Sequence, residues 1–427
     1  MNIIERGRAF VQSLRELAGR SVWDWRRCPR CGGRFTHKNG SYVRRPWTLD
    51  GRQEVRVQRH LCRDCGRTYS ERSPLLVRGS WYAREVHRYA IDHWQHVGSS
   101  LRRTAEWVRC HLGHQERWKL WRPLEERQEK RCHLSASTVH RWLDGAGRVA
   151  QESVGGQLEG IGFSEHLGTD GLWARLRGGA KRVVLMLVDS ASGLVWPAVV
   201  EGGEQSRKSW QRLFERARQA GLNLQAIGAV TSDGVSALVG YLRQRLPWVR
   251  HQRCVWHLWR MLSREVASQA SKVGSELVGE AARRASKQLR GQLVAFIRGV
   301  LDAQSYEGAE ASLAKLRRHP RGARIWKLLN QQFDAALVHL LDRHRGLTRV
   351  TPEWCWRDFR QRLSRGRNHG SQQRLERAAL VWAIYHNFTP AQRRCERKRH
   401  YRRPGRSPLE VAGHHPGGIS YLDALCV

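Results

Sequence analysis

Residues 168–200 read GTDGLWARLRGGAKRVVLMLVDSASGLVWPAVV, and this stretch decides the fold that we expect. Its apolar runs have the length of β-strands and are separated by short polar or glycine-rich connections. The three expected strands cover 168–175, 183–188, and 194–196 continued by 198–200. Three strands in series with such short connections favour an antiparallel meander.

The next segment supplies a helix and a further strand. An amphipathic helix is expected over 209–220, because Trp210, Leu213 and Ala217 fall on one side of it. The apolar run 226–230 predicts a fourth strand, which ends at Thr231-Ser232-Asp233-Gly234. Three strands, a helix and a fourth strand follow one another in the order of an RNase H-like fold.

Two aspartates fall on strands that are neighbours in such a sheet. Asp170 lies in the first strand and Asp233 at the end of the fourth, so both can bind the same metal ions. Clustered carboxylates are what two-metal phosphoryl transfer requires, and oxygen ligands suit Mg²⁺ or Mn²⁺. The alternative is structural, because Asp-Gly is a common turn element. Asp189 closes the second strand, and we interpret it as a turn residue without a metal.

The charge points to a polyanionic partner. Lys and Arg number 76 against 38 Asp and Glu, which leaves a formal net charge of +38. Contacts from these side chains to phosphate release counterions, so DNA or RNA is the expected partner. Most of the basic residues are arginine, and an arginine-rich source proteome is the alternative explanation for part of the excess. The 19 tryptophans indicate folded cores or faces that stack on bases.

Four cysteines near the N-terminus have the spacing of a zinc site. Cys28-Pro-Arg-Cys31 and Cys62-Arg-Asp-Cys65 are CxxC pairs, each able to place two sulfurs on one ion. Between them we expect turns at Asn39-Gly40 and Asp50-Gly51, and a half-buried strand over 54–59. This pattern predicts a zinc ribbon with a structural Zn²⁺ rather than disulfides. The alternative is two unrelated redox or structural pairs.

A helical region follows the expected zinc ribbon. Leu101, Ala105 and Val108 repeat at helical spacing after the capping pair Ser99-Ser100. The segment 134–143, LSASTVHRWL, resembles the second helix of a helix-turn-helix. The residues expected to face a DNA groove are Ser137, Thr138, His140 and Arg141. The connection 109–132 is longer than the usual turn, so an ordinary helical linker is the alternative.

The sequence carries no signal for a membrane. The longest apolar run, 183–188, is too short to cross a bilayer, and the first residues lack a signal peptide's apolar segment. We therefore expect an intracellular protein without a membrane partner.

At this point the sequence resembles the Mutator-type and related DDE transposases of bacterial insertion sequences. The resemblance rests on Thr231-Ser232-Asp233-Gly234, on Leu246-Pro247, and on the motif Gln252-Arg253-Cys254-Val255-Trp256-His257. It covers about 160–260 well and 345–415 more loosely. It implies a catalytic DDE triad with two Mg²⁺ or Mn²⁺ ions, and an all-helical insertion before the last acid. It also implies a bacterial cytoplasmic protein that associates with the nucleoid when bound to DNA.

The third acid that the resemblance implies is Glu353. The family motif is matched loosely by Thr348-Arg349-Val350-Thr351-Pro352-Glu353, and Tyr385-His386-Asn387-Phe388 follows at about the family's distance. Arginines expected to neutralise DNA phosphates come next: Arg357, Arg360, Arg362, Arg365 and Arg367. Glu376 is the alternative third acid, and either glutamate can also be an ordinary helix residue.

Cys254 and His257 form the family's signature pair, one helical turn apart. A zinc pair is one interpretation, but no second ligand pair lies nearby in the sequence. We favour packing beneath the active site. The closing segment Arg406-Ser407-Pro408-Leu409-Glu410-Val411-Ala412-Gly413 also resembles the family's end.

The expected architecture is a multidomain α+β protein. Its parts are a zinc ribbon (1–75), a helical DNA-binding region (76–150), the first part of an RNase H-like core (155–257), a helical insertion (258–345), and the core's end with a tail (346–427). The expected function is a transposase that binds terminal inverted repeats, cuts DNA and transfers strands, as a homodimer or larger assembly on DNA. The alternatives are a transposase-derived regulator without catalysis and an RNase H-like nuclease or resolvase.

Overall fold

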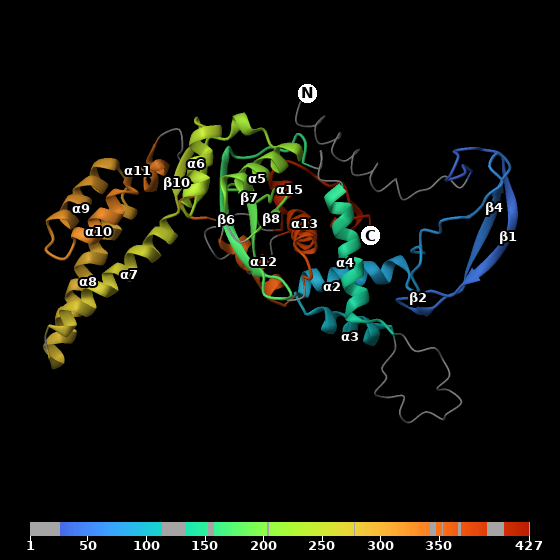
Figure 1. The fold of residues 1–427 in the computed structure, drawn as a ribbon, viewed down its shortest axis with the longest axis horizontal. Coiled ribbons are helices and arrows are strands. Elements are labelled where there is room, and N and C mark those ends of the chain that lie inside the picture. The colour runs from blue at the N-terminus through green and yellow to red at the C-terminus, as the bar shows by residue number, and fades with distance from the viewer. Residues whose placement is uncertain are drawn as a thin grey trace. The chain divides into compact units, whose positions relative to one another are not determined.

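The computed structural model describes most of the chain, and its residues form a mixed α+β architecture (Figure 1). The described ranges are 26–112, 133–152, 158–202, 205–276, 278–341, 347–351, 353–365, 369–390 and 405–426. The chain divides into two compact units. The first holds the described residues up to Ile161, with Arg175–Ala180 and the chain from Asp358 onward, and the second holds Gly162–Ala174 and Lys181–Arg357.

The first unit begins with a small antiparallel sheet of order β1-β4-β5, built from β1 (Thr36–Arg44), β4 (Val55–Cys62) and β5 (Thr68–Ser70). The predicted strand 54–59 is confirmed as part of β4. Its burial does not alternate strictly, because His60 is buried as deeply as Val57. His60 stacks on Tyr69 and forms a hydrogen bond with Glu71 at 2.8 Å. This hydrogen bond satisfies the buried imidazole.

One of the two predicted turns in this region is wrong. Asn39-Gly40 lies inside β1, where the register with β4 shifts between Lys38 and Ser41. Gly40 has φ +75°, so this dipeptide forms a β-bulge rather than a turn. Asp50-Gly51 does form a turn, between β2 (Trp47–Thr48) and β3 (Gly51–Arg52).

Three helices pack after this sheet: α2 (Arg84–Val97), α3 (Leu101–His111) and α4 (Ala136–Glu152). Ser100 caps α3 by accepting a bond from the Arg103 amide, as predicted. The predicted helix at 134–143 extends to Glu152, because Ala146 and Ala150 continue its buried face. Most of the connection 109–132 lies outside the described residues.

The C-terminal part of the chain completes the first unit. Helix α13 (Gln372–Phe388) packs along α4, where Gly147 lies against Arg377, and Arg377 forms an ion pair with Asp144 at 3.1 Å. Two short helices, α15 (Pro408–Val411) and α16 (Tyr421–Ala424), also contact α13. Both begin with capping boxes, so these short turns have well-defined starts.

The second unit is organised around a five-stranded sheet among its described residues, with strand order β10-β9-β6-β7-β8. The strands are β6 (His166–Arg175), β7 (Lys181–Asp189), β8 (Val199–Glu201), β9 (Ala229–Ser232) and β10 (Arg250–Arg253). β7 and β8 are antiparallel, whereas β9 runs parallel to both β6 and β10. Strand β7, which lies between β6 and β8, is buried from Val183 to Asp189, and this explains its unbroken apolar run.

Two strand predictions need correction at their boundaries. The third strand is only β8, with a single bridge between Val188 and Val195 before it. Pro197 separates the two pieces, because proline has no amide to donate to a sheet. The fourth strand begins at Ala229 rather than 226, since Leu224–Ala226 form a 3-10 turn that Asn223 caps.

Helices complete the second unit. Helix α5 (Arg207–Gln219) begins with a capping box formed by Ser206 and Ser209. It packs on β7 and β8, and α6 (Ser236–Arg245) packs on α5. A helical body follows, with its own core of leucine, isoleucine and valine. It consists of α7 (Val255–Ser275), α8 (Gly279–Leu301), α9 (Tyr306–Arg318), α10 (Ala323–Asn330) and α11 (Phe333–Ala336) (Figure 1). In the described part of the chain, no helix has the length and apolar character needed to span a membrane.

Candidate active site

The parallel pairing of β6 and β9 brings Asp170 and Asp233 to corresponding positions. The partners are His166 with Ala229 and Gly168 with Thr231. The same register, continued two residues further, aligns Asp170 with Asp233, which follows the last residue of β9. Two carboxylates 63 positions apart in the sequence therefore come to the same edge of the sheet.

Both aspartates are partly buried and lie beside His257. The Asp170 side chain is 12% exposed, and its Oδ2 lies 3.9 Å from Nε2 of His257 in the first turn of α7. Burial alone would lower the pKa of His257. The Cys254 thiol and the carboxylates of Asp170 and Asp233 outweigh it and raise that pKa. His257 is thus within electrostatic reach of both acids.

Cys254 holds a second segment against this edge of the sheet. It is fully buried as the N-cap of α7, and the Thr351 amide donates to its sulfur at 3.4 Å. Two further bonds fix the same segment: the Val255 amide donates to the Arg349 carbonyl at 2.9 Å, and the Thr231 hydroxyl to the Thr348 carbonyl at 2.8 Å. The chain therefore returns from the helical body to the end of β9.

This segment leads directly to Glu353. Glu353 is the first residue of α12 (Glu353–Arg365), two positions after Thr351, and it falls in the same compact unit as Asp170 and Asp233. Glu376 lies in α13 of the other unit and is buried, with 6% exposure.

Asp189 has the role expected from the sequence. Its Oδ1 accepts bonds from the amide and hydroxyl of Ser164, and its Oδ2 from those of Ser192. Four donors on one carboxylate fix the turn after β7.

Arg253 is a residue at this edge that sequence reasoning did not single out. It ends β10 opposite Ser232, and its guanidinium lies over Gly234, next to Asp233. Burial lowers the pKa of Arg253, and Asp233 partly offsets that effect. Its Nε and Nη1 atoms are buried without a hydrogen-bond partner among the described residues. The sequence feature that could have identified Arg253 is its place in the QRCVWH motif, directly before Cys254.

The arginines expected after Glu353 do not all face outward. Arg357 and Arg360 are exposed. Arg362 is only 8% exposed, pairs with Asp358 at 3.2 Å and lies over the Tyr385 ring. It therefore stabilises the packing of α12 against α13 and is largely withdrawn from the surface. The Arg365 side chain and Arg367 lie outside the described residues.

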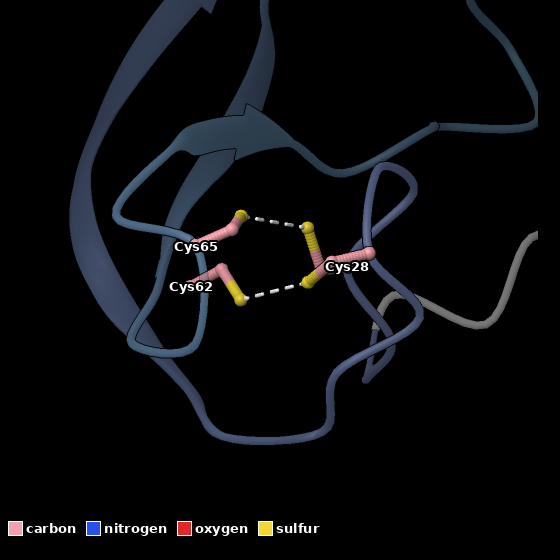
Figure 2. Close-up of side chains that lie close together, drawn as sticks. Cys28, Cys62 and Cys65 are labelled. Atoms are coloured by element: carbon pink, nitrogen blue, oxygen red, sulfur yellow. Dashed lines mark hydrogen bonds between the residues drawn. The ribbon is translucent and has the colours of Figure 1, made fainter.

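The four predicted zinc ligands converge. Their sulfur atoms all lie within 4.8 Å of one another, and Figure 2 shows Cys62 and Cys65 facing Cys28. The sulfurs of Cys28 and Cys65 are 3.7 Å apart, and those of Cys31 and Cys62 are 3.6 Å apart. Two sulfurs bound tetrahedrally to one Zn²⁺ are separated by about 3.8 Å, which follows from a Zn–S bond of about 2.3 Å.

The backbone around this cluster also favours metal binding. The amides of Cys31 and Arg30 face the Cys28 sulfur and lower the pKa of that thiol to about 7, whereas burial and the neighbouring thiols raise the pKa of Cys31 and of Cys65. Gly32 and Gly66 have positive φ, which lets each knuckle turn tightly. The cluster therefore fits a closed structural Zn²⁺ site that ties the loop before β1 to the end of β4.

The four residues expected to contact DNA lie near the start of α4 but in different surroundings. Ser137 and Arg141 are exposed, and Arg141 donates to the Thr138 hydroxyl at 3.1 Å. His140 is half-buried and lines a narrow cavity with His369 and Arg374 from the C-terminal part of the chain. Burial lowers the pKa of His140. Ser137 and Arg141 are therefore the exposed members of this set, whereas Thr138 and His140 are partly buried.

Comparisons with known proteins agree with the motif at 231–257. A comparison with curated proteins found no match. Residues 158–318 match the family described as Transposase, Mutator family. The matched segment contains Asp170, Asp233, Cys254 and His257, and it extends through the sheet into the helical body. The match over residues 158–318 therefore agrees with the resemblance to Mutator-family transposases that the sequence motifs indicate.

Proposed function

We propose that this protein is a DNA transposase of the DDE type. It binds the terminal inverted repeats of a mobile element, cuts DNA there and joins the freed ends to target DNA. The proposed catalytic residues are Asp170, Asp233 and Glu353. The observation that carries this proposal is the shared register of Asp170 and Asp233 at one edge of the sheet.

The sheet topology supports an RNase H-like core. The strand order is β10-β9-β6-β7-β8. The first strand of this sheet along the chain, β6, therefore lies beside the fourth, β9, and the two are parallel. Helices α7 to α11 lie between β10 and Glu353 in the sequence, which agrees with a helical insertion before the third acid.

The donor set fits divalent metal ions that prefer oxygen. Asp170 and Asp233 offer carboxylates at one sheet edge, and hard oxygen ligands of this kind suit Mg²⁺ or Mn²⁺. Two such ions, when bound, supply activation of the attacking oxygen and neutralise charge on the leaving oxygen. The protein's part is to hold the two aspartates in register and to fix the segment before Glu353 through Thr351.

The rest of the chain supports a DNA partner. The net charge of +38 favours a polyanionic partner. Trp256 is 40% exposed beside His257, with Arg260 over its ring at 5.5 Å, so a cationic aromatic surface adjoins the acids. The Cys₄ cluster is proposed to bind a structural Zn²⁺. We further propose a cytoplasmic protein that acts as a homodimer or larger assembly, because two element ends must be brought together.

The test is metal-dependent cleavage of labelled DNA that carries the element's ends. The wild-type protein should nick or join these ends in Mg²⁺, whereas Asp170→Asn and Asp233→Asn should bind them and fail to cut. Glu280→Gln is the matched control, because Glu280 is an exposed carboxylate on α8. Cleavage by either asparagine variant would overturn the proposed site.

The same assay separates the two alternative functions. A transposase-derived regulator would shift the labelled ends on a gel without cutting them. A nuclease or resolvase would cut without strand transfer, and the DNA flanking its gene would lack inverted repeats.

A further inference from the structure

The first unit contains a large pocket that the proposed catalytic site does not use. Its volume is about 630 Å³, within the range of small-molecule sites. We call it the Trp81 pocket, and its aromatic lining is formed by Trp47, Trp81, Tyr82 and Trp142. These residues come from the β2–β3 hairpin, the segment before α2, and α4.

Trp81 offers an accessible aromatic surface, whereas Trp142 packs against neighbouring rings. Trp81 is 72% exposed, which is unusual for so large an apolar side chain. Trp142 stacks on His87 with ring centroids 3.8 Å apart, and Tyr82 meets the Trp142 ring edge-on at 5.3 Å. Burial lowers the pKa of His87 to about 3, with Arg84 adding to the effect, so this wall is uncharged near neutral pH.

Apart from two histidines, His87 and His133, the basic side chains that line the pocket are arginines. Arg52, Arg78 and Arg141 line it and are exposed, and Arg52 lies over the Trp47 ring at 5.2 Å. No aspartate or glutamate is among the described residues of the lining. Arginine next to aromatic rings, without acids, fits a ligand that combines a planar ring with a negative charge.

Backbone hydrogen bonds hold the pocket in shape. The Trp47 amide donates to the Trp81 carbonyl at 2.8 Å, and the Ala83 amide donates back to Trp47 at 2.8 Å. The Ser80 hydroxyl bonds His87 at 2.9 Å and accepts from the Tyr82 amide at 3.0 Å. A preformed site loses little conformational entropy when a ligand binds.

We propose that the Trp81 pocket binds one unpaired nucleotide of a DNA strand. The base stacks on the tryptophans, and the arginines at the rim contact the phosphates on either side. A paired base cannot enter, because both of its faces are covered within the duplex. The site rests on the proposed function only in that DNA is the partner. Thr138 and Arg141, which the sequence assigned to DNA contact, line the same pocket.

The experiment compares two DNA duplexes with the full-length protein. One is fully paired, and the other carries a single bulged 2-aminopurine in the same sequence. The wild-type protein should bind the bulged duplex about tenfold more tightly, because stacking on an aromatic side chain contributes about 1–3 kcal/mol per base. The 2-aminopurine fluorescence should be quenched on binding. Equal affinity for the two duplexes, or absence of DNA binding, would overturn the proposal.

Substitutions locate the effect. Trp81→Ala should abolish the preference for the bulged duplex and leave affinity for the paired duplex within about twofold, and Trp81→Phe should restore much of the preference. Trp107→Ala is the control, because Trp107 is also exposed in this unit but lies on α3 outside the pocket. If Trp81→Ala kept the full preference, the pocket would not be the site. Asp170→Asn, tested in parallel, should keep the preference, so failure of the catalytic proposal remains distinguishable.

Discussion

His257 Nε2 lies 3.9 Å from Asp170 Oδ2, and His257 belongs to the same short motif as Cys254. The motif therefore connects the first aspartate to the segment that precedes Glu353. From this arrangement we predict that the Cys-x-x-His pair positions the neighbouring residues and does not form a second zinc site.

Replacement of His257 should impair cleavage without unfolding the protein. We expect His257→Ala to lower the cleavage rate about 10–100-fold, as for other residues that orient metal ligands. The Mg²⁺ concentration for half-maximal rate should rise, which a merely structural defect would not cause. The measurement is a Mg²⁺ titration of end cleavage, with the exposed His415→Ala as control. An unchanged Mg²⁺ requirement in His257→Ala would contradict this role.

Cys254 should affect activity through Thr351. Cys254→Ala removes the acceptor for the buried Thr351 amide, at a cost of about 1–3 kcal/mol. A displaced Glu353 should then lower the cleavage rate on the order of 100-fold. Cys254→Ser keeps an acceptor and should retain more activity. Hydrogen exchange at residues 347–351 checks the structural step. If exchange there were equally slow in Cys254→Ala and wild type, the tether would have no such role.

The Asp170–Asp233 pair was predictable from the sequence because strand order alone makes their strands neighbours. The apolar runs at 183–188 and 226–230 marked strands that are buried on both faces, and burial of this kind leaves a clear pattern. The predicted strand boundaries differ from the structure where a local effect competes with apolar character. Pro197 interrupted the third strand, and Asn223 capped a 3-10 turn that delayed the fourth.

Other features depended on contacts between distant residues. Asn39-Gly40 has the composition of a turn. Residues before and after this dipeptide pair with β4, however, so it forms a bulge within β1. Arg253 acquires its place beside Asp233 only through the pairing of β10 with β9. The Trp81 pocket is lined by residues from 47–52, 77–82 and α4. These segments are distant in the sequence, so no local motif predicts that they lie together.

Removal of zinc should unfold the N-terminal sheet selectively. The Cys₄ cluster joins the loop before β1 to the end of β4, and structural zinc sites contribute directly to folding. Cys62→Ser should reduce bound zinc from about one equivalent to none and expose β1 and β4 to proteolysis. Cys110→Ser is the control, because Cys110 is an exposed thiol on α3. Full zinc content in Cys62→Ser would exclude the proposed ligand set.

Stability should fall in mild acid because of His251. Burial, reinforced by Arg253 and Arg243, lowers the pKa of His251 from 6.5 to about 4. In the unfolded chain His251 becomes protonated as the pH falls below 6.5. In the folded protein it stays neutral until the pH approaches 4. This contribution is fully present above pH 6.5 and is lost as pH falls towards 4, by about 1.4 kcal/mol per pH unit.

A glutamine at this position tests the effect. His251→Gln can still bond the Ser232 hydroxyl, which His251 contacts at 2.8 Å, but it does not titrate. Its loss of stability between pH 7 and pH 5, measured by urea unfolding, should be smaller than that of wild type by about 2 kcal/mol. His415→Gln should match wild type. Equal losses in His251→Gln and wild type would show that His251 is not the group responsible.

Two glycines should respond to alanine in opposite directions. Gly234 has φ +76°, and a Cβ there would lie 2.3 Å from Nη1 of Arg253. Gly234→Ala should therefore cost roughly 1–2 kcal/mol from backbone strain alone and also displace Arg253 from Asp233. Gly291, in the exposed interior of α8, has nothing within 4 Å of its Cβ position, so Gly291→Ala should stabilise by roughly 0.5–1 kcal/mol.

Urea unfolding and end cleavage distinguish the two effects in these variants. Gly291→Ala should cleave DNA at the wild-type rate, because Gly291 lies in α8 of the helical body and far in the sequence from the proposed catalytic residues. Gly234→Ala should lose activity beyond its loss of stability, because Arg253 is displaced next to Asp233. Wild-type cleavage by a folded Gly234→Ala protein would mean that the position of Arg253 does not matter for the reaction.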